Sequence, residues 1–233
     1  MIKIQLLAIG IVAVIIAVIF VVAGFYGNNQ DDSITKTTDI TATTPPTVES
    51  VQEMLDKAAS IDSLYYEITM TIDMSQYGTQ TATMKIWQEK PYFKQQITTT
   101  TGDATNTITV IQRPEGTYLY DTLQGKYVLT ADIPPFTTSL QYLDSSMIKN
   151  LLNNQSFLQF ETETIDGKLA TTFEYTIALN GMNMTTKIWI WNEQGLPLKA
   201  YMDMTMEEMT MTMDLLFSNY SFADIPDSTF NVS

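Results

Sequence analysis

The sequence contains no cysteine and no histidine. Without cysteine the chain forms no disulfide and carries no lipidated cysteine anchor. Without histidine it lacks the usual general base at neutral pH and the commonest metal ligand. These absences exclude Ser-His-Asp and Cys-His catalysis and the usual zinc sites. Chemistry by a pair of carboxylates remains open.

Positive charge is scarce. The chain has 12 Lys and Arg against 26 Asp and Glu, a net charge of −14, and Arg113 is its one arginine. A surface this acidic repels phosphate backbones, so we expect no nucleic-acid partner. The sequence shows no phosphate-binding glycine loop and no clustered metal-ligand motif, so we expect no cofactor and no metal.

Seven carboxylates fall in the middle of predicted strands: Glu67, Asp73, Glu161, Glu163, Glu174, Asp203 and Asp214. We expect them to lie on a solvated face of the sheet. We therefore expect that the protein is not an enzyme.

A long apolar run lies near the N-terminus. Residues 6–25 include no charged or strongly polar side chain. A helix of that length spans about 30 Å at about 1.5 Å per residue, the hydrocarbon thickness of a bilayer. The apolar core of a cleaved signal peptide usually runs about 7–15 residues, and cleavage is the competing interpretation. We predict an uncleaved transmembrane anchor over residues 6–26.

The charges beside this run predict its orientation. Lys3 precedes the run, and Asp31 and Asp32 follow it. The positive-inside tendency then places residues 1–5 in the cytoplasm and the body outside, as a single-pass protein of the cell membrane. Four Asn-x-Ser/Thr sequons agree with an exterior location: Asn154, Asn183, Asn219 and Asn231.

Residues 27–47 are predicted to be a linker. Within residues 31–47, seven of the 17 residues are Thr and two adjacent residues are Pro. The segment has no apolar periodicity, so we expect an extended, solvated tether. The remainder, residues 48–233, is long enough for one domain with its own core.

The body begins with a helical pattern and continues with strands. Apolar residues from Val51 to Ile61 recur at spacings of three and four, which predicts a helix. Helical spacing returns over residues 136–153 and predicts one or two inserted helices. Elsewhere the period is 2, and Asp166-Gly167 predicts a two-residue hairpin turn. The whole predicts one large, strongly curved antiparallel sheet, with strands over residues 64–74, 79–88, 92–100, 106–112, 117–121, 126–130, 157–165, 168–178, 184–191, 196–206 and 209–220.

Methionine is concentrated near the C-terminus, where eight of the 14 lie between Met182 and Met213. Met adapts its shape to varied apolar partners, whereas Leu and Ile specify a tight core better. The pattern indicates a cavity for an apolar ligand such as an acyl chain. A core simply filled with methionine is the alternative. Six of these residues alternate along two successive strands: Met202, Met204, Met206, Met209, Met211 and Met213.

Several motifs, taken in order, resemble the outer-membrane lipoprotein carrier (LolA-like) superfamily over about residues 51–233. VQEMLDKAASIDSLYYEITMTI resembles its opening helix and first strand, and IWQEKPYFK and EGTYLYD resemble later strands. The best match is KIWIWNEQGLPLKAYM, followed by the closing segment NYSFADIPDSTFNV. The chain is thus similar to a membrane-anchored prokaryotic member of this superfamily.

The resemblance implies an unclosed β-barrel with helices covering its concave side and an apolar cavity between them. The family's carriers hold acyl chains in that cavity. Lys90 matches the position of the carriers' arginine before a proline, and the resemblance implies that it latches a helical lid. The fold class that we expect is therefore α+β, with one N-terminal transmembrane helix added.

These observations predict a membrane-tethered extracytoplasmic domain that binds a lipid, a lipoprotein or another apolar ligand. Its partners would be a lipid or acylated protein and, through the N-terminal helix, the cell membrane. The alternative is an envelope interaction or sensory ectodomain with a filled core, whose partner is an envelope protein. Strand alternation gives ten candidates for the cavity lining: Met70, Ile72, Met84, Ile86, Ile188, Ile190, Met202, Met204, Met211 and Met213.

Overall fold

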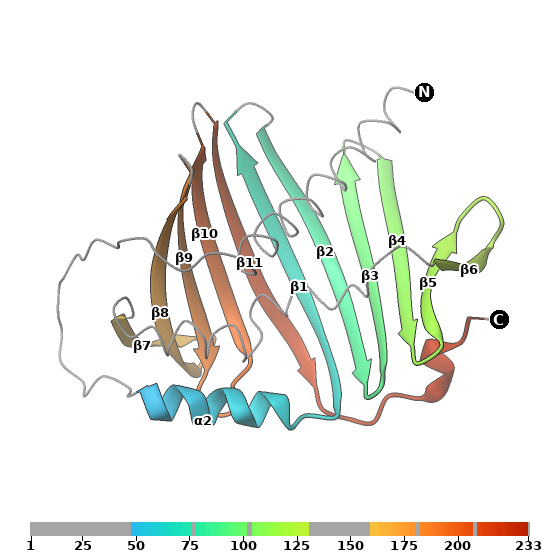
Figure 1. Ribbon diagram of the computed structural model, residues 1–233, viewed down its shortest axis with the longest axis horizontal. Coiled ribbons are helices and arrows are strands. Elements are labelled where there is room, and N and C mark those ends of the chain that lie inside the picture. The colour runs from blue at the N-terminus through green and yellow to red at the C-terminus, as the bar shows by residue number, and fades with distance from the viewer. Residues whose placement is uncertain are drawn as a thin grey trace.

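The computed structural model describes residues 48–75, 78–101, 104–130, 159–179, 182–206 and 209–232. These residues form one α-helix, eleven strands and one short 3-10 helix (Figure 1). The elements are α2 (Val48–Ala59), β1 (Ser63–Met74), β2 (Gly78–Glu89), β3 (Tyr92–Thr101), β4 (Ala104–Arg113), β5 (Gly116–Asp121), β6 (Lys126–Thr130), β7 (Gln159–Ile165), β8 (Lys168–Leu179), β9 (Met182–Trp191), β10 (Pro197–Met206), β11 (Met209–Ser221) and η2 (Asp227–Phe230).

All eleven strands lie in one antiparallel sheet, in the order β6-β5-β4-β3-β2-β1-β11-β10-β9-β8-β7. Two meanders, β1 to β6 and β7 to β11, are joined where the first strand pairs with the last (Figure 1). The predicted antiparallel sheet and its eleven strands are confirmed. The order of strands is linear, so the sheet is not closed into a barrel.

The turn between β7 and β8 shows why the predicted hairpins form. Asp166 and Gly167 both have positive φ, 49° and 76°, and Ile165 pairs with Lys168 on either side of them. Two central residues of positive φ match the twist of a tight hairpin, and Asp-Gly adopts this conformation readily. The predicted hairpin is confirmed.

The two faces of the sheet are packed differently. On one face a single buried cluster extends across the strands from β3 through β1 and β11 to β8, and it also includes Val51, Met54 and Leu55 of α2. The other face carries two separate small clusters, one around Ile111 and Phe230 and one around Trp189. Side chains converge on the concave side of a curved sheet and diverge on its convex side. We therefore call the face with the continuous cluster the inner face and the opposite face the outer face.

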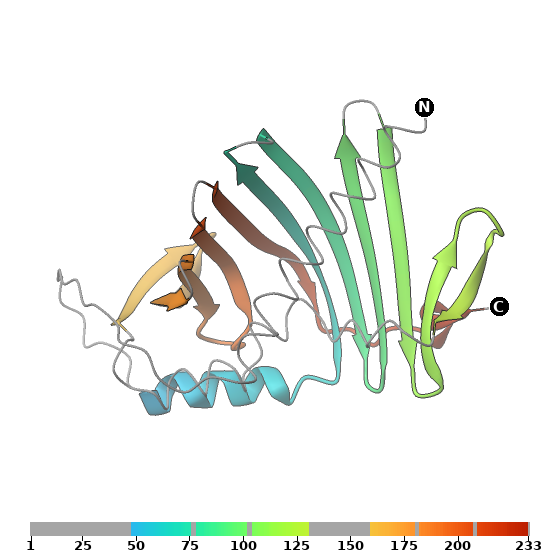
Figure 2. The same cartoon turned by 45° about the horizontal axis from the view of Figure 1, so that its top comes forward.

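Helix α2 lies across one end of the strands (Figures 1 and 2). Val51, Met54 and Leu55 occupy one side of the helix and are buried against the end of the inner face. The turn between β9 and β10 approaches the helix closely, because a Cβ added at Gly195 would lie 1.8 Å from the Met54 carbonyl oxygen. Glycine is needed at this position both for the approach and for its φ of +70°.

The expected α+β class, with helices covering the concave side, is wrong for the described chain. One large antiparallel sheet dominates the structure, and α2 is its one α-helix among these residues. Twelve helical residues extend about 18 Å, which is short against eleven strands spaced about 4.8 Å apart. The helix therefore covers one end of the sheet and leaves most of its width uncovered by described helices.

Three of the sequence predictions fall outside the described residues. They are the transmembrane anchor at residues 6–26, the linker at residues 27–47 and the inserted helices at residues 136–153. In the part of the chain that the structure describes, no helix has the length and apolar character needed to cross a membrane.

Candidate ligand-binding face

The ten residues predicted to line a cavity all lie on the inner face. Nine are buried, and Met202 is partly buried against the same cluster. They come from five strands, because alternate residues of each strand point to the same side of the sheet. The structure thus brings together all ten side chains that strand alternation had singled out.

The strand register arranges the methionines in rows across the sheet. Met74 pairs with Met211, Met211 with Met204, and Met204 with Met184, so four methionines follow one another over β1, β11, β10 and β9. At about 4.8 Å between strands this row extends about 14 Å. We call the following set the methionine face: Met70, Met74, Met84, Met184, Met202, Met204, Met211 and Met213.

Met74 and Met184 belong to this face but were not among the predicted lining residues. Alternation along a single strand indicates which side a residue occupies but not which residues lie beside it. Their place in the row follows from the pairing of β1 with β11, two strands that begin more than 140 residues apart. A period-2 pattern extended to every predicted strand would have included both.

Several buried polar side chains lie on the inner face, and two of them have an atom that lacks a hydrogen-bond partner in the described chain. Gln95 of β3 has its side-chain oxygen without a hydrogen-bond partner among the described residues, and Thr186 of β9 has its hydroxyl in the same state. Both side chains are 3% exposed. A buried polar atom without a partner costs about 1–3 kcal/mol, so these two positions stand out from the rest of the face.

Aromatic side chains pack at the junction of β1 and β11. Tyr66 stacks on Tyr220 with ring centroids 5.6 Å apart, and Phe217 lies beside Tyr66 at 6.5 Å. The Tyr220 hydroxyl donates to the Pro197 carbonyl. Burial raises the pKa of both tyrosine hydroxyls well above its usual value. The rings therefore stay uncharged at neutral pH and contribute apolar surface.

The seven mid-strand carboxylates lie on the outer face, as expected from alternation. Glu67 accepts hydrogen bonds from Tyr65 and Asn219, and the bond from Tyr65 is the main reason that its pKa is lowered. Glu163 accepts a hydrogen bond of 2.7 Å from the indole nitrogen of Trp189. Within the described ranges no three acidic side chains gather into a cation site. These hydrogen bonds connect strands on the outer face, β11 with β1 and β9 with β7.

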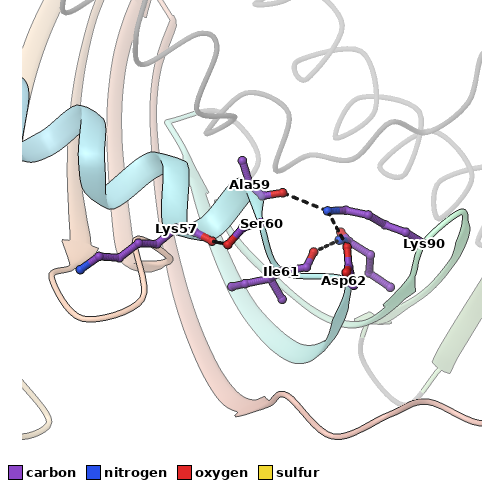
Figure 3. A network of polar contacts seen from close by, with 7 residues as sticks. Lys57, Ala59, Ser60, Ile61, Asp62 and Lys90 are labelled. Carbon is purple, nitrogen blue, oxygen red and sulfur yellow. Dashed lines mark hydrogen bonds and ion pairs between the residues drawn. The ribbon is translucent and has the colours of Figure 1, made fainter.

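Lys90 contacts the C-terminal end of α2. It lies in the turn between β2 and β3, and its Nζ donates to the Ala59 carbonyl at 2.9 Å and to Asp62 Oδ1 at 3.2 Å (Figure 3). A lysine at the C-terminal end of a helix satisfies a free carbonyl and opposes the negative end of the helix dipole. The predicted residue thus does contact a helix. Its role as the latch of a lid stays a prediction.

Replacing Lys90 by methionine should loosen the last turn of α2. We expect K90M to lower the free energy of unfolding by about 1 kcal/mol, because it removes one bond to a carbonyl and one exposed ion pair. Amide hydrogen exchange should quicken in residues 55–61. The control D62N keeps the bond to Ala59 and should change exchange less. Unchanged exchange in K90M would show that Lys90 does not hold the helix.

No family model and no curated protein matches the sequence. Solved structures do match. A LolA superfamily protein from Nitrosomonas europaea has a TM-score of 0.39 and 10% identity, over 80% of this chain and 98% of that chain. LprF from Mycobacterium bovis has a TM-score of 0.37 and 13% identity, over 78% and 97%. A chain of the Pseudomonas aeruginosa MucA/MucB complex has a TM-score of 0.44 and 12% identity, over 78% and 61%.

One of the matched structures is a LolA superfamily protein. All three TM-scores are below 0.5 and all three identities are far below 25%. Similarity at this level does not extend to what a protein binds. We therefore argue function from the contacts of this chain.

Proposed function

We propose that this protein is a membrane-tethered binding protein whose inner face holds the apolar part of a lipid, free or attached to a protein. The observation that carries the proposal is the methionine face, eight flexible thioether side chains gathered on one side of one sheet. Methionine side chains adjust to ligands of varied shape at little cost in strain. Because most of these methionines are already buried, the gain comes from the acyl chain itself, at about 25 cal/mol for each Å² of its apolar surface removed from water.

Other features support this function. The outer face is rich in threonine and charged residues, whereas the inner face presents Met, Ile and Phe over at least eight strands. The described carboxylates that could act in pairs are on the outer face, away from the methionine face, so we propose binding and not catalysis. The motifs shared with the LolA-like superfamily agree with an acyl-chain ligand. The apolar run at residues 6–25 would hold the domain at the outer side of a cell membrane.

Photochemical labelling tests this proposal. The full chain would be reconstituted in phosphatidylcholine vesicles that contain a phosphatidylcholine with a diazirine in one acyl chain. We expect light-induced adducts in β9, β10 and β11, besides any in residues 6–25. Adducts confined to residues 6–25 would contradict the proposal. Adducts on β2 and β3 that fall on outer-face residues such as Thr83 and Thr98 would contradict the assignment of the face.

A protein partner is the second candidate, carried by the β5–β6 hairpin. Leu123 at its tip is 97% exposed, Leu129 is 56% exposed and Tyr120 also faces solvent. Figures 1 and 2 show this hairpin extending from one edge of the sheet. Exposed apolar groups of this kind often mark a contact surface.

Chemical cross-linking in native membranes should then trap a protein partner through the β5–β6 hairpin. The double substitution L123S and L129S should abolish that cross-link without affecting lipid adducts.

A further inference from the structure

The amide of Gln95 lacks suitable partners at both of its ends. Its oxygen has no hydrogen-bond partner among the described residues. Its nitrogen lies 3.5 Å from the sulfur of Met84, and thioether sulfur is a weak acceptor. A primary amide offers two donors and one acceptor group. Among the described residues, the amide oxygen thus has no partner and the amide nitrogen has only a weak acceptor.

The described side chains beside Gln95 are apolar and cannot supply the missing hydrogen bonds. Its cross-strand neighbours are Ile86 on β2 and Val110 on β4, which are 0% and 3% exposed. Along its own strand the same face carries Phe93 and Ile97. The amide is therefore enclosed by apolar side chains on all four sides within the sheet. Leucine or methionine would fill this position without the loss of hydrogen bonds.

We propose that Gln95 recognises the polar group of an amphiphile whose chain lies on the methionine face. The group would be a hydroxyl or an amide N–H attached directly to the apolar chain, because the Gln95 oxygen needs a donor. A methyl ether or methyl ester cannot supply one. This inference rests on the proposed lipid-binding function and specifies its ligand class: lipids with a free hydrogen-bond donor beside the chain.

Gln95 is a better anchor for such a group than Thr186. Thr186 also has a buried hydroxyl on the inner face, between Met202 and Tyr175 in the register, and no described residue is its hydrogen-bond partner. It lies on β9, five strands from β3 in the sheet order, which is about 24 Å along the sheet. One head group cannot reach both. The Gln95 oxygen can only accept, so it requires a donor from its ligand, whereas the Thr186 hydroxyl can turn to donate or to accept. A head group chosen for its donor therefore belongs at Gln95.

A matched pair of competitors tests the inference. Oleyl alcohol and oleyl methyl ether differ in one O–H donor. Each would compete with the diazirine lipid for labelling of β9–β11 in the reconstituted full chain, at equal mole fractions in the bilayer. We expect the alcohol to compete about tenfold better than the ether, the difference that one hydrogen bond of about 1.4 kcal/mol provides.

Three variants identify the residue responsible. Gln95→Met keeps the length of the side chain and should bind alcohol and ether equally, with labelling retained and a raised urea midpoint of unfolding. Gln96→Met removes an amide from the outer face, where it donates to Thr109, and should keep the tenfold preference. Thr186→Val should keep it as well.

The possible outcomes distinguish a failure of the Gln95 inference from a failure of the proposed lipid-binding function. Absence of inner-face labelling in the unaltered protein would overturn the lipid-binding function. Labelling with equal competition by alcohol and ether would leave that function standing and overturn the role of Gln95, since a water molecule would then satisfy the amide. Loss of the preference in Thr186→Val and not in Gln95→Met would place the head group at the other end of the face and also overturn it.

Discussion

Gly195→Ala should lower the free energy of unfolding by about 4 kcal/mol. Two costs add. Alanine is disfavoured at a φ of +70°, and its Cβ would lie 1.8 Å from the carbonyl oxygen of Met54 and 3.4 Å from the Cβ of Ala58. The contact is with backbone, so no side-chain rotation relieves it. The helix must move away from the turn between β9 and β10, which exposes Met54 and Leu55.

Gly167→Ala is the matched control. Its φ is +76°, close to that of Gly195, but a Cβ there meets nothing within 4 Å. Its cost should therefore be the backbone term alone, about 1 kcal/mol. Urea unfolding followed by tryptophan fluorescence measures both variants, because all three tryptophans lie in the sheet. Equal losses in the two variants would mean that α2 does not pack against this turn.

Ile68→Lys should cost about 5 kcal/mol or prevent folding. Ile68 is 2% exposed, at the centre of the inner face between Met84 on β2 and Phe217 on β11. The described cross-strand neighbours offer an ammonium group there no anionic partner. Burial of this kind shifts the pKa of lysine by up to 3–5 units, about 1.4 kcal/mol for each unit. The lost packing of isoleucine adds to this cost.

Thr69→Lys provides the comparison one residue along the strand. Thr69 lies on the outer face, where it is exposed and pairs with Thr83. A lysine at an exposed position of an acidic protein should change stability by no more than about 0.5 kcal/mol. A one-residue shift in register exchanges the two faces. If Thr69→Lys proved the more harmful of the two, our assignment of inner and outer faces would be inverted.

Local pattern in the sequence was sufficient to predict the strands. Several of them have a clear period of 2, as β1 does, and most connections carry turn residues such as Asp166-Gly167. The face occupied by Ile72 or Met204 follows from the same alternation, because side chains point to opposite sides at successive positions. This is why all ten predicted lining residues lie together.

The contacts between distant strands could not be predicted in the same way. The pairing of β1 with β11 joins residues such as Met74 and Met211, and no local pattern specifies it. The isolation of Gln95 depends likewise on its cross-strand neighbours Ile86 and Val110, so the sequence alone gave no reason to single it out. The expectation of helices over the concave side came from the family resemblance. The described chain departs from it, because α2 is short and lies at the ends of the strands.

The central claim is that the inner face holds a lipid. Native mass spectrometry tests it most directly on the full chain purified from membranes and then cut by a protease at a site introduced within residues 31–47, which releases the sheet domain from the apolar run. We predict a released domain carrying one lipid per chain, lost on denaturation. A bare polypeptide mass, with no saturable uptake when lipid is added back, would contradict the account.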